Sequence, residues 1–202
     1  MDVVCRLIDE GFNYQKIAEE ISLIKDEYIS RTKAWKGLSL RNGLTGENST
    51  SEQSIILTNS SDSTGVKECF DTKYLKDMPY TSEILNSIAS RFGTKLGLVR
   101  ILKLCVGGKI TPHVDTDLFN FDKGKIYRFH LVVATNPDVN FMIKGHCYNF
   151  EQGSLYFTDV SHMHSVENNG TTDRYHIVMD FEATAMLKEI ILNGKDVSYQ
   201  TK

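Results

Sequence analysis

The sequence lacks the features that would assign the chain to a membrane, secreted or nucleic-acid-binding class. No apolar run approaches the roughly 20 residues that a membrane helix requires, and the charged N-terminus does not resemble a signal peptide. The net charge is only −3, so no positive field draws the chain to nucleic acid or anionic lipid. We therefore expect a cytoplasmic protein without a nucleic-acid or membrane partner, and the oligomeric state is left open.

Cysteine is scarce, and its four copies are scattered with no C-x-x-C pair: Cys5, Cys69, Cys105 and Cys147. This absence argues against a redox pair or a cysteine-ligated zinc site, and in a cytoplasmic chain we expect free, buried thiols. Internal repeats and a second domain boundary are also missing. We expect residues 1–202 to form a single domain.

Residues 1–95 are expected to form a helical N-terminal support. Its elements are a strand over 3–8, an amphipathic helix over 14–28 capped by Asn13, a strand over 35–40 and a helix capped by Thr81 or Ser82 and ended by Gly93. Residues 43–67 break this pattern because Ser, Thr, Asn and Gly dominate there. Such a segment is either disordered or a lid over a site, and the sequence favours neither interpretation.

Residues 96–182 have the alternation and turn residues of a β-rich core. The expected strands are 96–104, 109–113, 127–134, 140–143, 153–157, 164–167 and 174–181. Short strands at this spacing, after two helices, predict a mainly β protein with flanking helices and a double-stranded β-helix (jelly-roll, cupin-like) core. Residues 183–202 are expected to close the chain with a helix over 183–192 and a tail.

A group of histidine and acidic side chains is the first sign of chemistry. His113 and Asp115 lie two residues apart on an extended segment, so their side chains point the same way. A histidine from a later strand can complete a metal site, and His162 and His164 both qualify because they share a face. Two imidazoles and one carboxylate, with open positions opposite, suit a non-haem Fe(II) oxygenase.

Arginine residues near this group need anionic partners. Arg174 begins an otherwise apolar strand, where an unpaired buried charge is costly. Its partner is either the far carboxylate of a dicarboxylate co-substrate or a neighbouring acid, Asp173 or Asp180. His176 shares the face of Arg174 and either supports the site from behind its binding residues or packs in the core, which is the favoured interpretation. Arg100 either clamps a substrate carboxylate or forms a surface ion pair, which is the favoured interpretation.

Several ordered motifs carry a family resemblance. They are Gly-Gly-Lys-Ile-Thr-Pro-His-Val-Asp at 107–115, Arg-Phe-His-Leu at 128–131, Gly-Ser-Leu-Tyr-Phe at 153–157, His-Ser-Val-Glu-Asn at 164–168, and Arg174 with Asp180. With these motifs, residues 100–181 resemble the aspartyl/asparaginyl β-hydroxylase family of Fe(II)/2-oxoglutarate dioxygenases. Within that family the chain looks most like bacterial proline hydroxylases that act on the free amino acid.

The resemblance implies a role for each matching position. The iron ligands, which are also the catalytic residues, would be His113, Asp115 and His164. Arg174 would bind the C5 carboxylate of 2-oxoglutarate, and Arg128 and His130 would face that co-substrate. The His-x-Val-x-Asn context favours His164 over His162 as the ligand. His162 and Arg100 then become candidate substrate residues.

The implied reaction uses Fe(II), 2-oxoglutarate and O₂ to hydroxylate an unactivated C–H bond of an amino acid or amino-acid-like small molecule, producing succinate and CO₂. Asp115 favours hydroxylation, because halogenating relatives leave its position open for chloride. Three alternatives remain: a hydroxylase of a peptide or protein residue, a non-catalytic cupin-like module that binds a metal or ligand, and a Zn(II) hydrolase on the same ligands. The hydrolase is disfavoured because the sequence offers no obvious general base.

Overall fold

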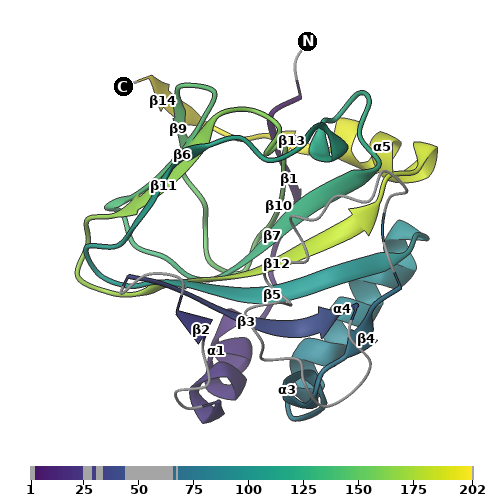
Figure 1. Ribbon diagram of the computed structural model, residues 1–202, viewed down its shortest axis with the longest axis horizontal. Coiled ribbons are helices and arrows are strands. Elements are labelled where there is room, and N and C mark those ends of the chain that lie inside the picture. The colour runs from purple at the N-terminus through teal and green to yellow at the C-terminus, as the bar shows by residue number, and fades with distance from the viewer. Residues whose placement is uncertain (1–2, 25–28, 31–33, 44–65, 67, 202) are drawn as a thin grey trace.

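Two antiparallel β-sheets face each other, and helices cover the outer side of the larger sheet (Figure 1). The computed structural model describes residues 3–24, 29–30, 34–43, 66 and 68–201. Most of the segment 43–67, for which a lid was one interpretation, lies outside the described residues. The double-stranded β-helix core predicted from the sequence is confirmed.

The larger sheet contains nine strands within the described part of the chain. They are β1 (Cys5–Asp9), β2 (Ile29–Ser30), β3 (Trp35–Asn42), β4 (Phe70–Asp71), β5 (Leu96–Leu104), β7 (Ile126–Ala134), β10 (Leu155–Thr158), β12 (Arg174–Glu182) and β13 (Lys195–Asp196). Their order is β13-β1-β10-β7-β12-β5-β3-β2, and β4 pairs with β3. This order places β5, β7 and β12 at the centre of the sheet.

The smaller sheet has the order β14-β9-β8-β11-β6. Its strands are β6 (Lys109–His113), β8 (Val139–Ile143), β9 (His146–Tyr148), β11 (His164–Asn168) and β14 (Tyr199–Thr201). The sequence did not predict β2, β4, β9, β13 and β14, because strands of two or three residues are too short to show a periodic pattern.

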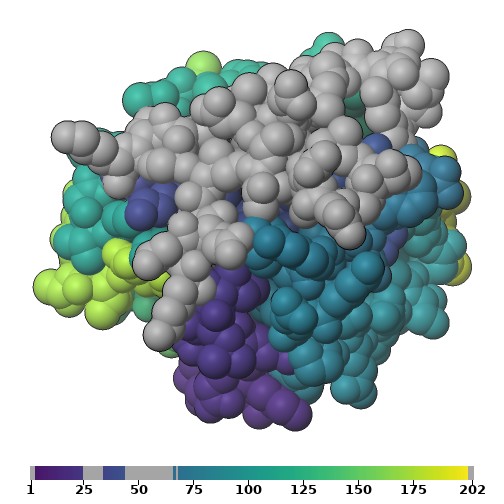
Figure 2. Space-filling model, turned by 60° about the horizontal axis from the view of Figure 1, so that its bottom comes forward, coloured from purple at the N-terminus to yellow at the C-terminus, as the bar shows by residue number. Residues whose placement is uncertain are grey.

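The helices are α1 (Tyr14–Leu23), α3 (Lys73–Lys76), α4 (Pro79–Phe92) and α5 (Ala185–Leu192), with a short 3₁₀ turn η1 (Asp117–Phe119). As predicted, the Asn13 side chain caps α1 and Gly93, at φ 59°, ends α4. The predicted N-cap of α4 was three or four residues late, because the N-cap is Met78 and the helix begins at Pro79. The Glu20 carboxylate, rather than a local cap, accepts the free N–H groups of Tyr80 and Thr81. Figure 2 shows α1 beside α3 and α4 on the outer surface. None of the described helices is long and apolar enough to span a membrane.

Strand alternation gives the larger sheet one apolar face and one polar face. On β5, β7 and β12, the side chains that face the helices form the main core: Val99, Ile101, Phe129, Leu131, Ile177 and Met179. The intervening side chains, which face the smaller sheet, are largely charged or imidazole groups: Arg100, Arg128, His130, Arg174 and His176. The inner face of this sheet is therefore the wall of a polar site.

Candidate active site

A glycine turn brings the two histidines of the metal group together. Gly107 has φ +71°, and a Cβ at Gly108 would lie only 2.8 Å from the Cys105 carbonyl oxygen. The turn is tied to the end of β11, because Gly107 donates to the Asn168 carbonyl and Asn168 donates to that of Gly108. Pairing of β6 with β11 then sets His113 directly opposite His164.

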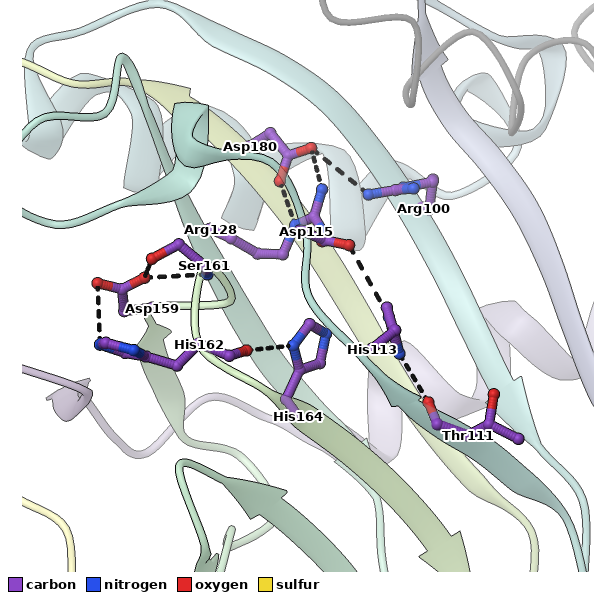
Figure 3. Close-up of polar contacts among 10 residues, drawn as sticks. All are labelled: Arg100, Thr111, His113, Asp115, Arg128, Asp159, Ser161, His162, His164 and Asp180. Atoms are coloured by element: carbon purple, nitrogen blue, oxygen red, sulfur yellow. Dashed lines mark hydrogen bonds and ion pairs between the residues drawn. The ribbon is translucent and has the colours of Figure 1, made fainter.

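The side chains of His113, Asp115 and His164 form a group suited to a metal ion. Their potential ligand atoms all lie within 4.8 Å of one another. Each imidazole donates Nδ1–H to a backbone carbonyl: His113 to Thr111 at 2.8 Å, and His164 to His162 at 2.9 Å. These bonds leave both Nε2 lone pairs available, as a metal ligand requires (Figure 3). Burial, together with the nearby His113, lowers the pKa of His164 and favours the neutral ligand form.

The loop before β11 gives His162 and His164 different surroundings. The His162 ring turns away from the other two ligands, with Nε2 3.9 Å from Asp159 Oδ2 (Figure 3). Its carbonyl oxygen orients His164. His162 is absent from the residues that line the cavity beside the metal group. The predicted role of His162 in substrate binding stays a prediction.

Arg128 links the metal group to the larger sheet. Its Nη1 donates to Asp115 Oδ2 at 2.6 Å, while Nε and Nη2 donate to the two oxygens of Asp180 at 2.7 and 2.8 Å. Burial opposes the charge of Arg128, but the attraction of Asp180 and Asp115 outweighs it and raises the pKa of Arg128. Arg100 Nη2 lies 3.4 Å from the same Asp180. The ion pair expected for Arg100 is therefore present, but its location at the surface was wrong, because Arg100 is only 6% exposed.

Arg174 has no carboxylate partner among the residues that the structure describes. Its side chain is 1% exposed, and Nη2 donates to Nδ1 of His176 at 2.7 Å. Both salt-bridge alternatives are wrong, because Asp173 binds Lys103 at 2.8 Å and Asp180 binds Arg128. Burial lowers the pKa of Arg174 to about 9. The guanidinium is a buried cation that an anionic ligand would neutralise.

Two neutral histidines complete this part of the site. Burial, with the positive field of Arg174, lowers the pKa of both His130 and His176 well below 6.5. Because arginine can only donate, Nδ1 of His176 is an acceptor, and Nδ1 of His130, 3.3 Å away, must donate to it. Nε2 of His130 is then an acceptor and Nε2 of His176 a donor, each buried without a hydrogen-bond partner in the described chain. Packing in the core was the favoured interpretation for His176, but its contact with Arg174 agrees with the alternative, a supporting role that their shared face had suggested.

One cavity of about 160 Å³ unites these groups. Its polar lining residues are Arg100, His113, Asp115, Arg128, His130, His164 and Arg174. Arg174 and His176 also border a larger open cavity of about 690 Å³, which includes none of the three metal-group residues. The smaller cavity is therefore where a metal and a ligand of Arg174 would meet.

Solved structures with this fold define its class. The chain matches an oxidoreductase of the 2OG-Fe(II) oxygenase family from Burkholderia pseudomallei with a TM-score of 0.52 at 13% identity, covering 90% of this chain and 79% of that one. It matches the viral collagen prolyl hydroxylase of Paramecium bursaria Chlorella virus-1 with a TM-score of 0.53 at 8% identity, covering 90% and 97%. At these identities the likeness is one of fold alone.

The family follows from sequence comparison. The aspartyl/asparaginyl β-hydroxylase family model matches residues 9–184, and the chain belongs to this family, as its motifs predicted. A curated relative, the L-proline cis-4-hydroxylase of Rhizobium meliloti (strain 1021), is 23% identical over 188 residues. That match covers 90% of this chain but 62% of the relative, so the chain spans less than two thirds of the relative's length.

Proposed function

We propose that the chain is an Fe(II)- and 2-oxoglutarate-dependent dioxygenase that hydroxylates an unactivated C–H bond of an amino acid or amino-acid-like substrate. One observation carries the proposal: three potential metal ligands line the same cavity as a buried arginine that has no carboxylate partner among the described residues. A non-redox binding module has no need for that arginine. Membership of the β-hydroxylase family supports the same conclusion.

The metal would be held by His113 Nε2, His164 Nε2 and a carboxylate oxygen of Asp115. Arg128 uses Oδ2 of Asp115, which leaves Oδ1, 3.8 Å from His113 Nε2, for the metal. Two histidines and one carboxylate leave positions open for other ligands. Iron bound there would supply the oxidative chemistry, in which O₂ and 2-oxoglutarate are converted to succinate and CO₂ as the substrate is hydroxylated.

The chain's own residues would bind and orient 2-oxoglutarate. Arg174 would pair with the C5 carboxylate through a two-pronged charge-assisted contact, which is strong when water is excluded. His176 would hold the guanidinium in place through its 2.7 Å hydrogen bond. The free Nε2 acceptor of His130 and the guanidinium of Arg128 border the same cavity, in line with their predicted place beside the co-substrate.

The cavity favours a small substrate that carries a carboxylate, such as an amino acid. About 160 Å³ is well below the roughly 300–1,000 Å³ of sites for drug-sized ligands. Arg100 lines the cavity 3.4 Å from Asp180, and we place the carboxylate of the substrate beside this arginine. The L-proline cis-4-hydroxylase relative makes free L-proline the first candidate. All four cysteines are free, in keeping with the cytoplasmic location that we propose.

The test is an anaerobic titration of the metal-free protein with Fe(II) and then 2-oxoglutarate. A weak visible charge-transfer band should appear when 2-oxoglutarate chelates the bound iron. His164→Ala should lose the band, whereas His162→Ala, a matched change two residues away, should keep it. Amino acids are then screened for perturbation of the band, with L-proline first, and succinate is measured under air.

Each outcome separates the alternatives. Iron binding without a band would favour the non-redox module. Zinc binding with no succinate formation would favour the hydrolase. A band that responds only to peptides would replace the free amino acid by a peptide substrate, and failure to bind both iron and 2-oxoglutarate would end the proposal.

A further inference from the structure

The metal-group carboxylate of Asp115 depends on a distant part of the fold for its orientation. Asp115 follows the end of β6, in a loop held by the hydrogen bond of its N–H to the Val160 carbonyl oxygen at 3.0 Å. Its side chain is 19% exposed, and its shortest side-chain contact is the 2.6 Å bond from Arg128. The loop alone therefore does not fix which carboxylate oxygen faces the two histidines.

Arg128 can orient Asp115 only if the guanidinium is itself fixed. The Asp180 carboxylate makes a two-pronged contact with this guanidinium, accepting from Nε at 2.7 Å and from Nη2 at 2.8 Å. A guanidinium is planar and rigid, so two fixed nitrogens determine where the third one points. The remaining Nη1 is the atom that donates to Asp115 (Figure 3).

Asp180 is buried in the larger sheet. It lies on β12 directly opposite Arg128 on β7, near the centre of the larger sheet. It is 3% exposed, and Arg100 on β5 lies 3.4 Å from its far oxygen. The order of contacts thus runs from the sheet through Asp180 and Arg128 to the loop residue Asp115.

We propose that Asp180 is a positioning residue for the metal centre, which acts through Arg128 to present Oδ1 of Asp115 to the metal. This inference rests on the proposed function, because it takes Asp115 as a metal ligand. Outer partners of metal ligands typically contribute 10- to 100-fold to metal affinity. A purely structural ion pair would contribute to stability alone.

The experiment measures Co(II) affinity of the metal-free protein by the visible absorption of the bound ion, alongside the melting temperature. Asp180→Asn should weaken Co(II) binding about 10- to 100-fold. The matched control is Glu20→Gln, which also changes a carboxylate with three short contacts to its amide, but at the start of α4. It should lower the melting temperature and leave Co(II) affinity unchanged.

A second variant shows whether Asp180 acts through Arg128. Arg128→Lys keeps the charge, but an ammonium group cannot make the two-pronged contact with Asp180 and also donate to Asp115. It should therefore weaken Co(II) binding to a similar extent. In the double variant, adding Asp180→Asn to Arg128→Lys should weaken Co(II) binding little further, because the effects of residues that act through one another do not add. Arg128→Lys also provides the test should Asp180→Asn fail to fold.

The failures of the two proposals are distinguishable. A wild-type protein that binds neither Co(II) nor Fe(II) refutes the metal site and, with it, the proposed function. A wild-type protein that binds metal while Asp180→Asn binds it equally well refutes only the positioning role. Additive losses in the double variant also refute that role, since Asp180 would then act independently of Arg128.

Discussion

Two buried arginines on neighbouring strands of one sheet have opposite surroundings. Arg128 on β7 donates to two carboxylates, and they raise its pKa against the effect of burial. Arg174 on β12 has no carboxylate within the described chain, and burial lowers its pKa to about 9. Both guanidinium groups face the same cavity. Only one of them has a charge that the fold itself compensates.

This difference indicates that Arg128 stabilises the site, whereas Arg174 is available to bind an anionic ligand. A buried charge without a partner destabilises the folded chain unless something outside the chain neutralises it. Arg174 therefore makes sense as a binding residue for an anion such as 2-oxoglutarate. Arg128 instead connects the sheet to the metal-group loop.

Removing Arg128 should have the largest effect on stability. Arg128→Met leaves Asp180 and Asp115 without their strongest partner, and breaking a buried pair in this way costs about 3–5 kcal/mol. We expect the free energy of unfolding, measured with urea in the metal-free protein, to fall by that amount. A loss below about 1 kcal/mol would mean that the Asp180–Arg128–Asp115 contacts are not formed as described.

The same substitution at Arg174 should leave stability intact and damage binding. Arg174→Met removes a buried charge that has no carboxylate, so the ligand-free protein should unfold at the same or a higher urea concentration. Affinity for 2-oxoglutarate should fall by about 2–5 kcal/mol, which is roughly 30-fold or more. The measurement is the iron charge-transfer titration.

A different result for Arg174→Met would argue against Arg174 as the residue that binds 2-oxoglutarate. A marked loss of stability with unchanged 2-oxoglutarate affinity would place its anionic partner inside the chain. An added inorganic anion that stabilises the wild type but not Arg174→Met would instead support an anion site at Arg174, which borders both cavities.

Only one side of the contrast between Arg128 and Arg174 could be predicted from the sequence. The spacing of His113 and Asp115, and the apolar strand around Arg174, predicted the metal group and the isolated cation. The partner of Arg128 was not predictable, because Asp180 is 52 residues away and becomes its neighbour only through the register of β7 with β12. Arg100 was assigned to the surface for the same reason.

Strand alternation predicts which residues share a face but not what lies opposite them. It could not separate His162 from His164, which are of the same type and share a face. The loop distinguishes the two side chains, because the His162 carbonyl accepts from His164 while the His162 ring turns to Asp159, and this favours His164 as the proposed ligand. The main sheets were predictable because their long strands carry period-two patterns, whereas two-residue strands carry none.

The neutral histidines next to Arg174 should make the free energy of unfolding depend on pH. The expected size of this effect lies between those of the buried and the exposed arginine substitutions. Their pKa values lie well below 6.5 in the folded chain, so below about pH 6.5 the unfolded chain binds protons that the folded chain does not. Stability should therefore fall as pH falls, by up to about 1.4 kcal/mol per pH unit for each histidine. His176→Gln keeps an acceptor for Arg174 and should remove one of these contributions, seen in urea unfolding between pH 6.5 and 5.

The pH comparison has its own control, because His130 and the carboxylates are present in both proteins. The difference between the two stability curves isolates His176. Identical slopes would show that His176 is protonated in the folded state, and its hydrogen bond from Arg174 would then be impossible.

A third arginine, on the surface, should give the smallest effect. Arg91 on α4 pairs with Asp9, but its side chain is 44% exposed and that of Asp9 34%. Exposed ion pairs typically contribute about 0–1 kcal/mol, because water and salt screen the attraction. Arg91→Met should therefore change the free energy of unfolding by less than about 1 kcal/mol, and less at high salt, with metal and 2-oxoglutarate affinity unchanged. If it matched Arg128→Met, burial would not distinguish these arginines, and the contrast between Arg128 and Arg174 would need another cause.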